Sequence, residues 1–215
     1  MARAEPSVGV PVAWATPGEP VPVRLMNTIW ADRGGVHDAL SNRGQLGDWL
    51  RVVGLTATPV TVTKDDLVIG LRLRDALRRL AALLTEDDRP AAVSAIPDVS
   101  TAINEINTIA SSTAGPRLQL RHGVLEQDTS PVGRPVPAAL AAVASESIDL
   151  LTDTTAPLLR ACHAPGCVLY FVKDHPRREW CSAACGNRAR AARHYARHSG
   201  HTSATDPKLS RPTPR

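Results

Sequence analysis

The sequence predicts an α+β protein in two parts. The first is a mostly helical N-terminal domain that contains a β-hairpin, and the second is a small C-terminal unit. Two observations carry the first part: apolar residues recur every three to four positions through much of the first 150 residues, and two short runs of strand-like residues flank a His-Gly dipeptide. The second part is predicted from the cysteines, because all four of them fall in residues 162–185.

The N-terminal segment is rich in proline, with five prolines in residues 1–22. Proline removes a backbone donor and breaks regular structure, so we expect a flexible leader over residues 1–20, with one edge strand near residues 10–14. Residues 23–30 are expected to form a short strand that leads into a loop at residues 32–35.

Helices follow in series, at residues 45–53, 63–84, 98–110 and from the end of a Pro/Gly loop (residues 131–137) to about residue 151. The second of them opens with Thr63 and Asp66, which resemble a capping box. Its apolar residues share one face, and Arg74 and Arg78 are expected along the flank of that face. The runs 117–121 and 124–127 are expected to pair as the hairpin, since Gly123 supplies the positive φ that a tight turn needs.

These elements predict a division of the chain into four segments. A domain with its own core spans residues 21–157 and ends in a short joint near residues 152–157. The C-terminal unit spans residues 158–199, and a disordered basic tail of residues 200–215 follows, in which Ser, Thr, Pro and charged types predominate.

The cysteine spacing, C-x4-C-x13-C-x3-C, predicts one structural Zn²⁺. Two close pairs, each supplied by a tight turn, are what a tetrahedral site of four thiolates requires. Disulfides would suit a short secreted domain, but no apolar signal stretch is present, so we expect a reducing cytoplasm and no membrane span. His163 and His175 are the alternative donors. The expected ligands are Cys162, Cys167, Cys181 and Cys185.

Around these cysteines the pattern predicts a treble-clef-like zinc finger. Residues 162–167 form a knuckle, residues 168–172 a strand, residues 173–178 a turn and residues 179–181 a return strand. Ser182 then caps a helix that runs to about residue 198. Cys185 would lie in the first turn of that helix, where the helix dipole favours a thiolate.

The charge of the chain is concentrated in this unit, which carries eight Lys and Arg and two acids between residues 160 and 199, against a net +4 for the whole chain. A basic surface of this kind indicates a polyanionic partner. A helical wheel places Ala184, Arg188, Ala191, Ala192 and Tyr195 on an inward face, and Arg188 is expected there as a buried fork. The expected nucleic-acid contacts are the opposite stripe and the turn: Arg190, Arg193, Arg197, Lys173, Arg177 and Arg178.

The stretch 160–198, with Trp180-Cys181-Ser182 followed by Cys185-Gly186-Asn187-Arg188, resembles the CGNR zinc finger of bacterial proteins. In that family the finger follows a domain called ABATE. Segments 25–28, 46–50 and 73–78 and the hairpin look like the ABATE pattern, although many members have one more residue between the third and fourth cysteines. The resemblance implies a stress-induced transcription regulator with the four cysteines as metal ligands. Structural roles are expected for Trp180, Asn187 and Arg188.

We therefore expect a bacterial transcription regulator that contacts double-stranded DNA and is not an enzyme, because four thiolates leave zinc no open coordination position. The N-terminal domain would bind an effector or form a homodimer. An RNA- or ribosome-associated module and a protein-interaction adaptor stay open as alternatives. A ligand pocket is considered against a purely local structural role for a further set of residues: Asn27, Thr28, Trp30, Asp32, Arg74 and Arg78.

Overall fold

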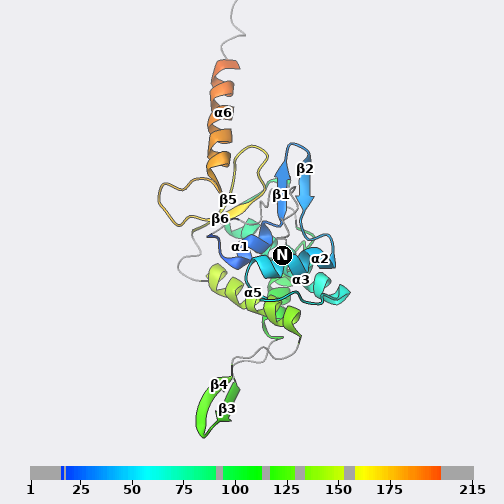
Figure 1. The fold of residues 1–215 in the computed structure, drawn as a ribbon. Coiled ribbons are helices and arrows are strands. Elements are labelled where there is room, and N and C mark those ends of the chain that lie inside the picture. Colours follow the sequence, from blue (N-terminus) through cyan, green and yellow to red (C-terminus); the bar gives the residue numbers. More distant parts are fainter. Residues whose placement is uncertain are drawn as a thin grey trace, which may run out of the picture.

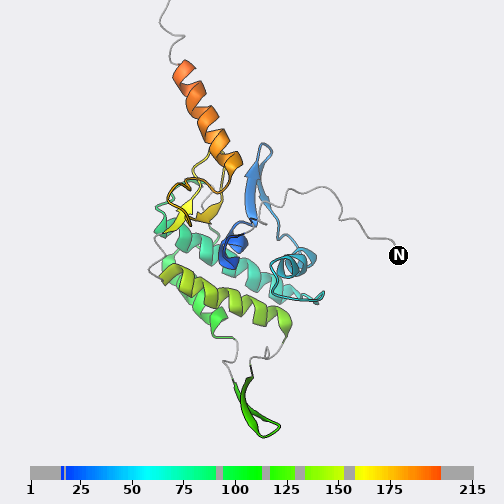
Figure 2. The ribbon, with the colours of Figure 1, turned by 60° about the vertical axis from the view of Figure 1, so that its left-hand side comes forward.

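The computed structural model of the chain describes residues 16, 18–90, 94–112, 117–128, 134–152 and 158–199. Its body is a group of five helices in which the long α3 packs against all the others (Figures 1 and 2). Three two-stranded antiparallel sheets are attached to this body. The helices are α1 (Val21–Met26), α2 (Arg43–Val52), α3 (Lys64–Leu84), α4 (Val99–Ala110) and α5 (Pro135–Thr152).

Side-chain caps set the starts of the central helices, as the sequence predicts. Thr63 accepts a hydrogen bond from the Asp66 backbone N–H at 3.2 Å, and the Asp66 carboxylate accepts one from the Thr63 backbone N–H at 2.8 Å. This reciprocal pair satisfies two donors that the first turn of α3 leaves without a partner. Asn42 and Gln45 form a second capping box, so α2 begins at Arg43, two residues before the expected start.

The strand expected at residues 23–30 is wrong, because the chain forms α1 there and β1 begins only at Ile29. Proline is tolerated in the first turn of a helix, where its missing N–H would have no partner in any case. Pro22 occupies that turn in α1, and Pro135 and Pro137 occupy it in α5. A six-residue helix is unstable alone, and α1 persists because Val23, Leu25 and Met26 are fully buried.

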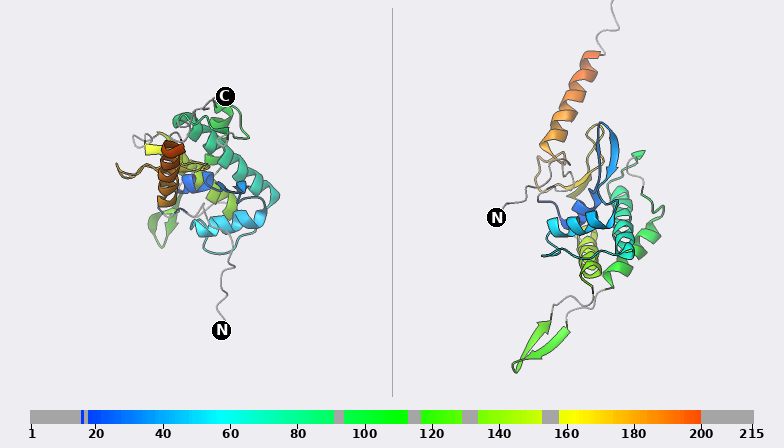
Figure 3. Two further views of the ribbon diagram at one scale, coloured as in Figure 1. Left: turned by 90° about the horizontal axis from the view of Figure 1, so that it is seen from above. Right: turned by 45° about the vertical axis from the view of Figure 1, so that its right-hand side comes forward.

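Two hairpins extend from the body. Strands β1 (Ile29–Asp32) and β2 (Gly35–Asp38) pair around the expected loop. Strands β3 (Arg117–Arg121) and β4 (Val124–Asp128) form the expected hairpin, whose turn residues His122 and Gly123 both have positive φ, 51° and 81°. This second hairpin projects from the end of the molecule opposite to the C-terminal helix α6 (Ala183–Ser199) (Figures 1 and 3).

The C-terminal unit consists of β5 (Leu159–Ala161), a knuckle, β6 (Tyr170–Val172) and α6. The predicted combination of knuckle, hairpin and helix is confirmed, but the return strand at residues 179–181 is wrong. Strand β6 pairs with β5 instead, with Leu159 opposite Val172 and Ala161 opposite Tyr170.

Side chains explain why no return strand forms, because they already occupy the outer edge of β6. Asn27 donates to the Tyr170 carbonyl and accepts from the Tyr170 N–H, both at 2.9 Å. Glu19 accepts from the Val172 N–H at 2.9 Å, and Arg178 donates to the Val172 carbonyl at 3.0 Å. An edge strand whose polar groups are satisfied in this way offers nothing for another strand to pair with.

The helical body and the C-terminal unit share both hydrophobic clusters. Leu159, Ala161 and Tyr170 belong to the main core of the helical body. Conversely, residues 29–31 of β1 pack against the cluster that surrounds the four cysteines. The C-terminal unit is therefore packed into the helical body.

Several predictions concern residues beyond those described. Most of the leader at residues 1–20, with its strand at residues 10–14, most of the joint at residues 152–157 and the tail at residues 200–215 lie outside the described residues, so the segment boundaries stay predictions. The flexible leader does not extend to residue 20, because Glu19 is buried and bonds the Val172 N–H. Among the described residues, no helix has both the length and the apolar character needed to cross a membrane.

The contacts of Asn27 generate a prediction. Asn27→Ala would leave the N–H and carbonyl of Tyr170 buried without partners, and each such group costs about 1–3 kcal/mol. We expect the free energy of unfolding to fall by about 2–4 kcal/mol in urea denaturation of the zinc-loaded protein. Asn42→Ala, which removes an exposed cap, should cost only about 1 kcal/mol. Equal losses for the two variants would contradict the role of Asn27 at the edge of β6.

Candidate functional site

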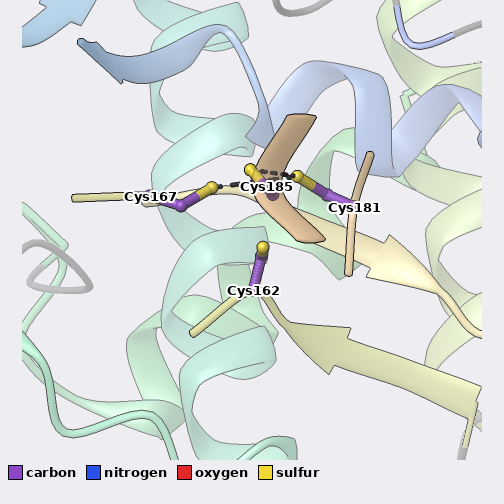
Figure 4. A group of neighbouring side chains, drawn as sticks. All are labelled: Cys162, Cys167, Cys181 and Cys185. Atoms are coloured by element: carbon purple, nitrogen blue, oxygen red, sulfur yellow. Dashed lines mark hydrogen bonds between the residues drawn. The ribbon is translucent and has the colours of Figure 1, made fainter. Parts of the chain in front are cut away.

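Four buried cysteine side chains converge between the knuckle and the start of α6 (Figure 4). All four sulfur atoms lie within 4.8 Å of one another, with Sγ–Sγ distances of 3.8 Å for Cys167–Cys181 and 3.4 Å for Cys181–Cys185. A zinc–sulfur bond of about 2.3 Å in tetrahedral geometry requires sulfur atoms about 3.8 Å apart. The donor set and its spacing therefore fit one zinc ion held by four thiolates. No disulfide joins them.

Local backbone structure orients the side chains of the first pair of cysteines, Cys162 and Cys167, towards the metal site. The Cys167 N–H donates to the Ala164 carbonyl at 2.9 Å, which closes the knuckle, and Gly166 has a φ of +70°. A side chain at that φ would be strained, so glycine favours the turn. The Cys162 N–H donates to the Leu169 carbonyl at 2.9 Å and holds the two ends of the knuckle together.

The second pair is positioned by the start of α6. As predicted, the Ser182 hydroxyl caps this helix by accepting from the Cys185 N–H at 3.2 Å, and Cys185 lies in the first turn. A guanidinium N–H of Arg188 donates to the Cys185 sulfur at 3.2 Å. This contact favours the thiolate form of Cys185, which is the form that binds a metal.

The alternative donors do not join the cluster. His163 and His175 are both exposed, and neither belongs to the group of sulfur atoms. The His175 ring instead accepts a hydrogen bond from the Arg177 N–H at 3.1 Å. The ligands are the four cysteines.

The residues that follow Cys185 pack around Trp180. A Cβ on Gly186 would lie 3.0 Å from Trp180 Cδ1, closer than most real Cβ contacts, so a larger residue at this position would push the indole aside. The Arg193 guanidinium lies over the indole at 5.9 Å. Asn187 accepts from Arg190 at 2.5 Å. These contacts support the structural roles expected for Trp180 and Asn187.

The inward face expected for α6 is wrong. Of the residues of α6 whose burial is described, only Cys185, Gly186 and Ala189 are buried, and all five residues of the expected face are exposed: Ala184, Arg188, Ala191, Ala192 and Tyr195. An inward face of that kind forms on a helix that lies along the body, whereas α6 is anchored at its first two turns and then projects away from the body (Figures 1 and 2). Arg188 therefore acts on the Cys185 sulfur and is not a buried fork.

The basic residues fall into two groups. Arg190, Arg193 and Arg197 are exposed and line a hollow on one face of α6 together with His194, which the sequence analysis did not single out. Arg178 differs, because its guanidinium is used within the protein. It forms an ion pair with Glu19, donates to the Val172 and Cys181 carbonyls and lies 5.1 Å from the centre of the Phe171 ring. In the turn, Lys173 is half-buried and Arg177 is exposed.

The residues considered for a ligand pocket make contacts within the protein. Asn27 and Thr28 are fully buried, and the expected flank position of Arg74 and Arg78 is wrong, because only 5% and 2% of these residues is exposed. Arg74 forms an ion pair with Asp38 at 2.7 Å, while Arg78 donates to the Met26 and Val168 carbonyls at 3.1 and 3.4 Å.

Trp30 and Asp32 from the same set lie on or beside the β1–β2 turn. Trp30 stacks on His37, with the ring centroids 4.4 Å apart, and Asp32 pairs with His37 at 2.8 Å. These contacts favour the local structural role for the set, and a ligand there stays a prediction.

Sequence reasoning missed three residues that hold the finger: Glu19, Asp87 and Arg89. Arg89 donates to the carbonyls of Cys162 and Cys167, at 2.6 and 2.7 Å. No periodicity or motif marks these residues, because their partners in the finger lie 73 to 159 positions away along the chain.

The fold and the site define a zinc-finger protein in which a helical domain carries a four-cysteine finger at its C-terminal end. Two family models match the chain. Residues 19–154, more than half of the sequence, match ABATE, described as "Putative stress-induced transcription regulator", and residues 159–198 match the CGNR zinc finger. The chain therefore belongs to the ABATE family, in agreement with the resemblance noted in the sequence. The description is that of a regulator and not of an enzyme. A search among curated proteins found no match.

Removing a ligand tests the metal centre. Cys185→Ser should abolish stoichiometric zinc, measured by elemental analysis of the dialysed protein, because a hydroxyl is a far weaker zinc ligand than a thiolate. His163→Ala removes an exposed donor next to Cys162 and should keep one zinc per chain. A Cys185→Ser protein with full zinc content, or one that lost zinc with an unchanged melting temperature, would show that the site is not the structural centre described.

Proposed function

We propose that this protein is a DNA-binding transcription regulator in which zinc fixes the start of α6 and the rest of α6 contacts double-stranded DNA. One observation carries the proposal. From Arg190 to His198 every residue of α6 is exposed, and the helix contains four arginines, two histidines and no acidic residue.

A solvated helix ordinarily mixes charges of both signs and gains stability from oppositely charged pairs three or four residues apart. In α6 no such pair exists, so its positive charge needs a partner outside the helix. The 17 residues span about 26 Å, and the major groove of DNA admits an α-helix. Arginine is suited both to phosphates and to guanine edges.

The β1–β2 hairpin offers a second contact at the same end of the molecule. It points towards the same end of the molecule as the start of α6 (Figures 1, 2 and 3), and residues 29–31 at its base pack against the cysteine cluster. Arg33 at the tip is exposed and has no bonding partner among the described residues. The neighbouring Asp32 carboxylate is occupied by the Gly34 N–H and His37.

The N-terminal domain would then sense an effector or hold two copies together. A single small finger gains affinity mostly from phosphates, so sequence specificity needs such a second contribution. Leu120, Val124 and Leu125 of the β3–β4 hairpin are between 58% and 68% exposed.

The α6 contact is tested with the double variant Arg190→Ala/Arg193→Ala. The affinity of this variant for fragments of host genomic DNA is measured by fluorescence anisotropy at several salt concentrations. We expect it to be at least about tenfold lower than that of the wild type. The slope of log affinity against log salt should decrease by about two, because each lost phosphate contact releases roughly one counterion fewer. The control Arg51→Ala removes an exposed arginine of α2 that pairs with Asp48. Unchanged binding by the double variant, with zinc retained, would remove α6 from the interface.

The hairpin contact has a separate signature. Arg33→Ala should reduce the salt slope by about one and leave the contribution of Arg190 and Arg193 intact. Arg43→Ala, an exposed arginine at the start of α2, serves as the matched control. If only the α6 variant loses affinity, the hairpin plays no part while the proposed function stands. If the wild-type protein binds RNA or an acidic protein and not DNA, the proposed function itself is wrong.

A further inference from the structure

We infer that Arg89 is a positioning residue of the zinc centre, through which the helical N-terminal domain controls how tightly the finger holds its metal. This inference concerns the metal and does not depend on whether the protein binds DNA. It rests on the position of one guanidinium, which lies between the helical body and the knuckle.

Arg89 bridges the two metal-binding residues of the knuckle. A single nitrogen, Nη1, donates to the carbonyl oxygens of both Cys162 and Cys167, at 2.6 and 2.7 Å. These carbonyls belong to the residues whose thiolates bind zinc, so the guanidinium fixes the separation of the two backbone segments. Partners outside the first ligand shell commonly orient metal ligands in this manner.

Asp87 fixes Arg89 in turn. The Asp87 carboxylate accepts from Nε and Nη2 of Arg89, each at 2.6 Å, and the Asp87 side chain has no exposed surface. Burial alone would raise the pKa of Asp87, but the hydrogen bonds and charge of Arg89 outweigh it and lower that pKa, so the pair is ionised. A planar two-bond ion pair leaves Arg89 little rotational freedom.

The end of α3 positions Asp87. The Asp87 N–H donates to the Ala82 carbonyl at 2.9 Å and the Glu86 N–H donates to the Leu83 carbonyl at 3.3 Å, with Glu86 at a φ of +51°. This is the Schellman arrangement, which ends a helix at a defined residue. The Tyr170 hydroxyl donates to Asp87 Oδ2 at 3.2 Å. Asp87 is thus held both by α3 and by β6 of the finger.

The positive charge of Arg89, like its position, favours the zinc-bound form of the finger. Four thiolates around one Zn²⁺ carry a net charge of −2, and the backbone carbonyls of Cys162 and Cys167 add negative dipoles beside it. Arg89 places a fixed positive charge at these carbonyls, and its own pKa is raised chiefly by its bond to Asp87. Any change in the end of α3 would move this charge relative to the knuckle.

Zinc competition on the full-length protein tests the inference. The affinity for zinc is measured by titration with a chromophoric chelator, for the wild type and for Arg89→Met, Arg89→Lys and Asp87→Asn. We expect Arg89→Met to weaken zinc binding by roughly 10- to 100-fold. Arg89→Lys keeps the charge but cannot span both carbonyls and bind Asp87, so it should recover only part of the loss. Asp87→Asn should lie between Arg89→Met and the wild type.

Two controls separate positioning from general destabilisation. Arg79→Met removes a nearby arginine of α3 that bonds the Pro97 carbonyl and, among the described residues, forms no hydrogen bond or ion pair with the finger, so it should leave the zinc affinity unchanged. Leu140→Ala opens a cavity in the buried core of α5 and should lower the melting temperature with zinc affinity unchanged.

Cobalt substitution adds a readout that stability does not affect. Arg89→Met should shift the thiolate-to-cobalt absorption bands, whereas Leu140→Ala should not. An Arg89→Met protein with wild-type zinc affinity, or an equal loss of zinc by Leu140→Ala at matched stability, would overturn the inference.

Discussion

The outer edge of β6 is the constraint on which the rest of this structure depends. A finger of about forty residues has too little apolar surface for a full core and relies on its metal and on neighbouring elements. Here the neighbour supplies hydrogen bonds as well as packing, because Asn27 and Glu19 satisfy backbone groups of Tyr170 and Val172. Removing water from a strand edge is favourable only if its N–H and C=O groups find partners. The finger is thus completed by residues more than 140 positions away along the chain.

This arrangement divides the finger into a fixed and a free part. The knuckle, β5 and β6 are enclosed between α1, α3 and the β1 strand. The buried residues of α6 are Cys185, Gly186 and Ala189, whereas every residue from Arg190 to His198 is exposed and the contact of Arg193 with the Trp180 ring lies at the surface. Zinc and the helical domain therefore fix the direction in which the basic helix α6 projects from the molecule. A helix needs a fixed first turn and an exposed surface to enter a groove of nucleic acid at a defined angle.

Local signals in the sequence predicted the elements that depend on neighbouring residues. Thr63 with Asp66, Ser182 with Cys185 and the His122-Gly123 turn all act within three or four positions, and each has the expected geometry. The cysteine spacing is also a local signal, since each pair is closed by one turn, and it predicted the metal ligands. Predictions failed where the structure of a segment depends on residues that are distant in the sequence and pack against it. The short helix α1 exists because its apolar side chains are buried, and Arg74 and Arg78 are enclosed because other segments cross α3 and present a carboxylate and carbonyls to them.

The sequence by itself therefore determined the chemical groups of the site. These are four thiolates, a capped helix that begins at the second pair of cysteines, and an excess of positive charge on that helix. The tertiary structure decided which arginines are available. Arg178 is held by Glu19 and by the finger's own carbonyls, and Arg89 reaches the knuckle from the helical domain, whereas Arg190, Arg193 and Arg197 stay at the surface. All five residues look alike in a sequence. Their roles differ because a guanidinium takes its function from the acceptors that the folded chain brings within about 3 Å of it.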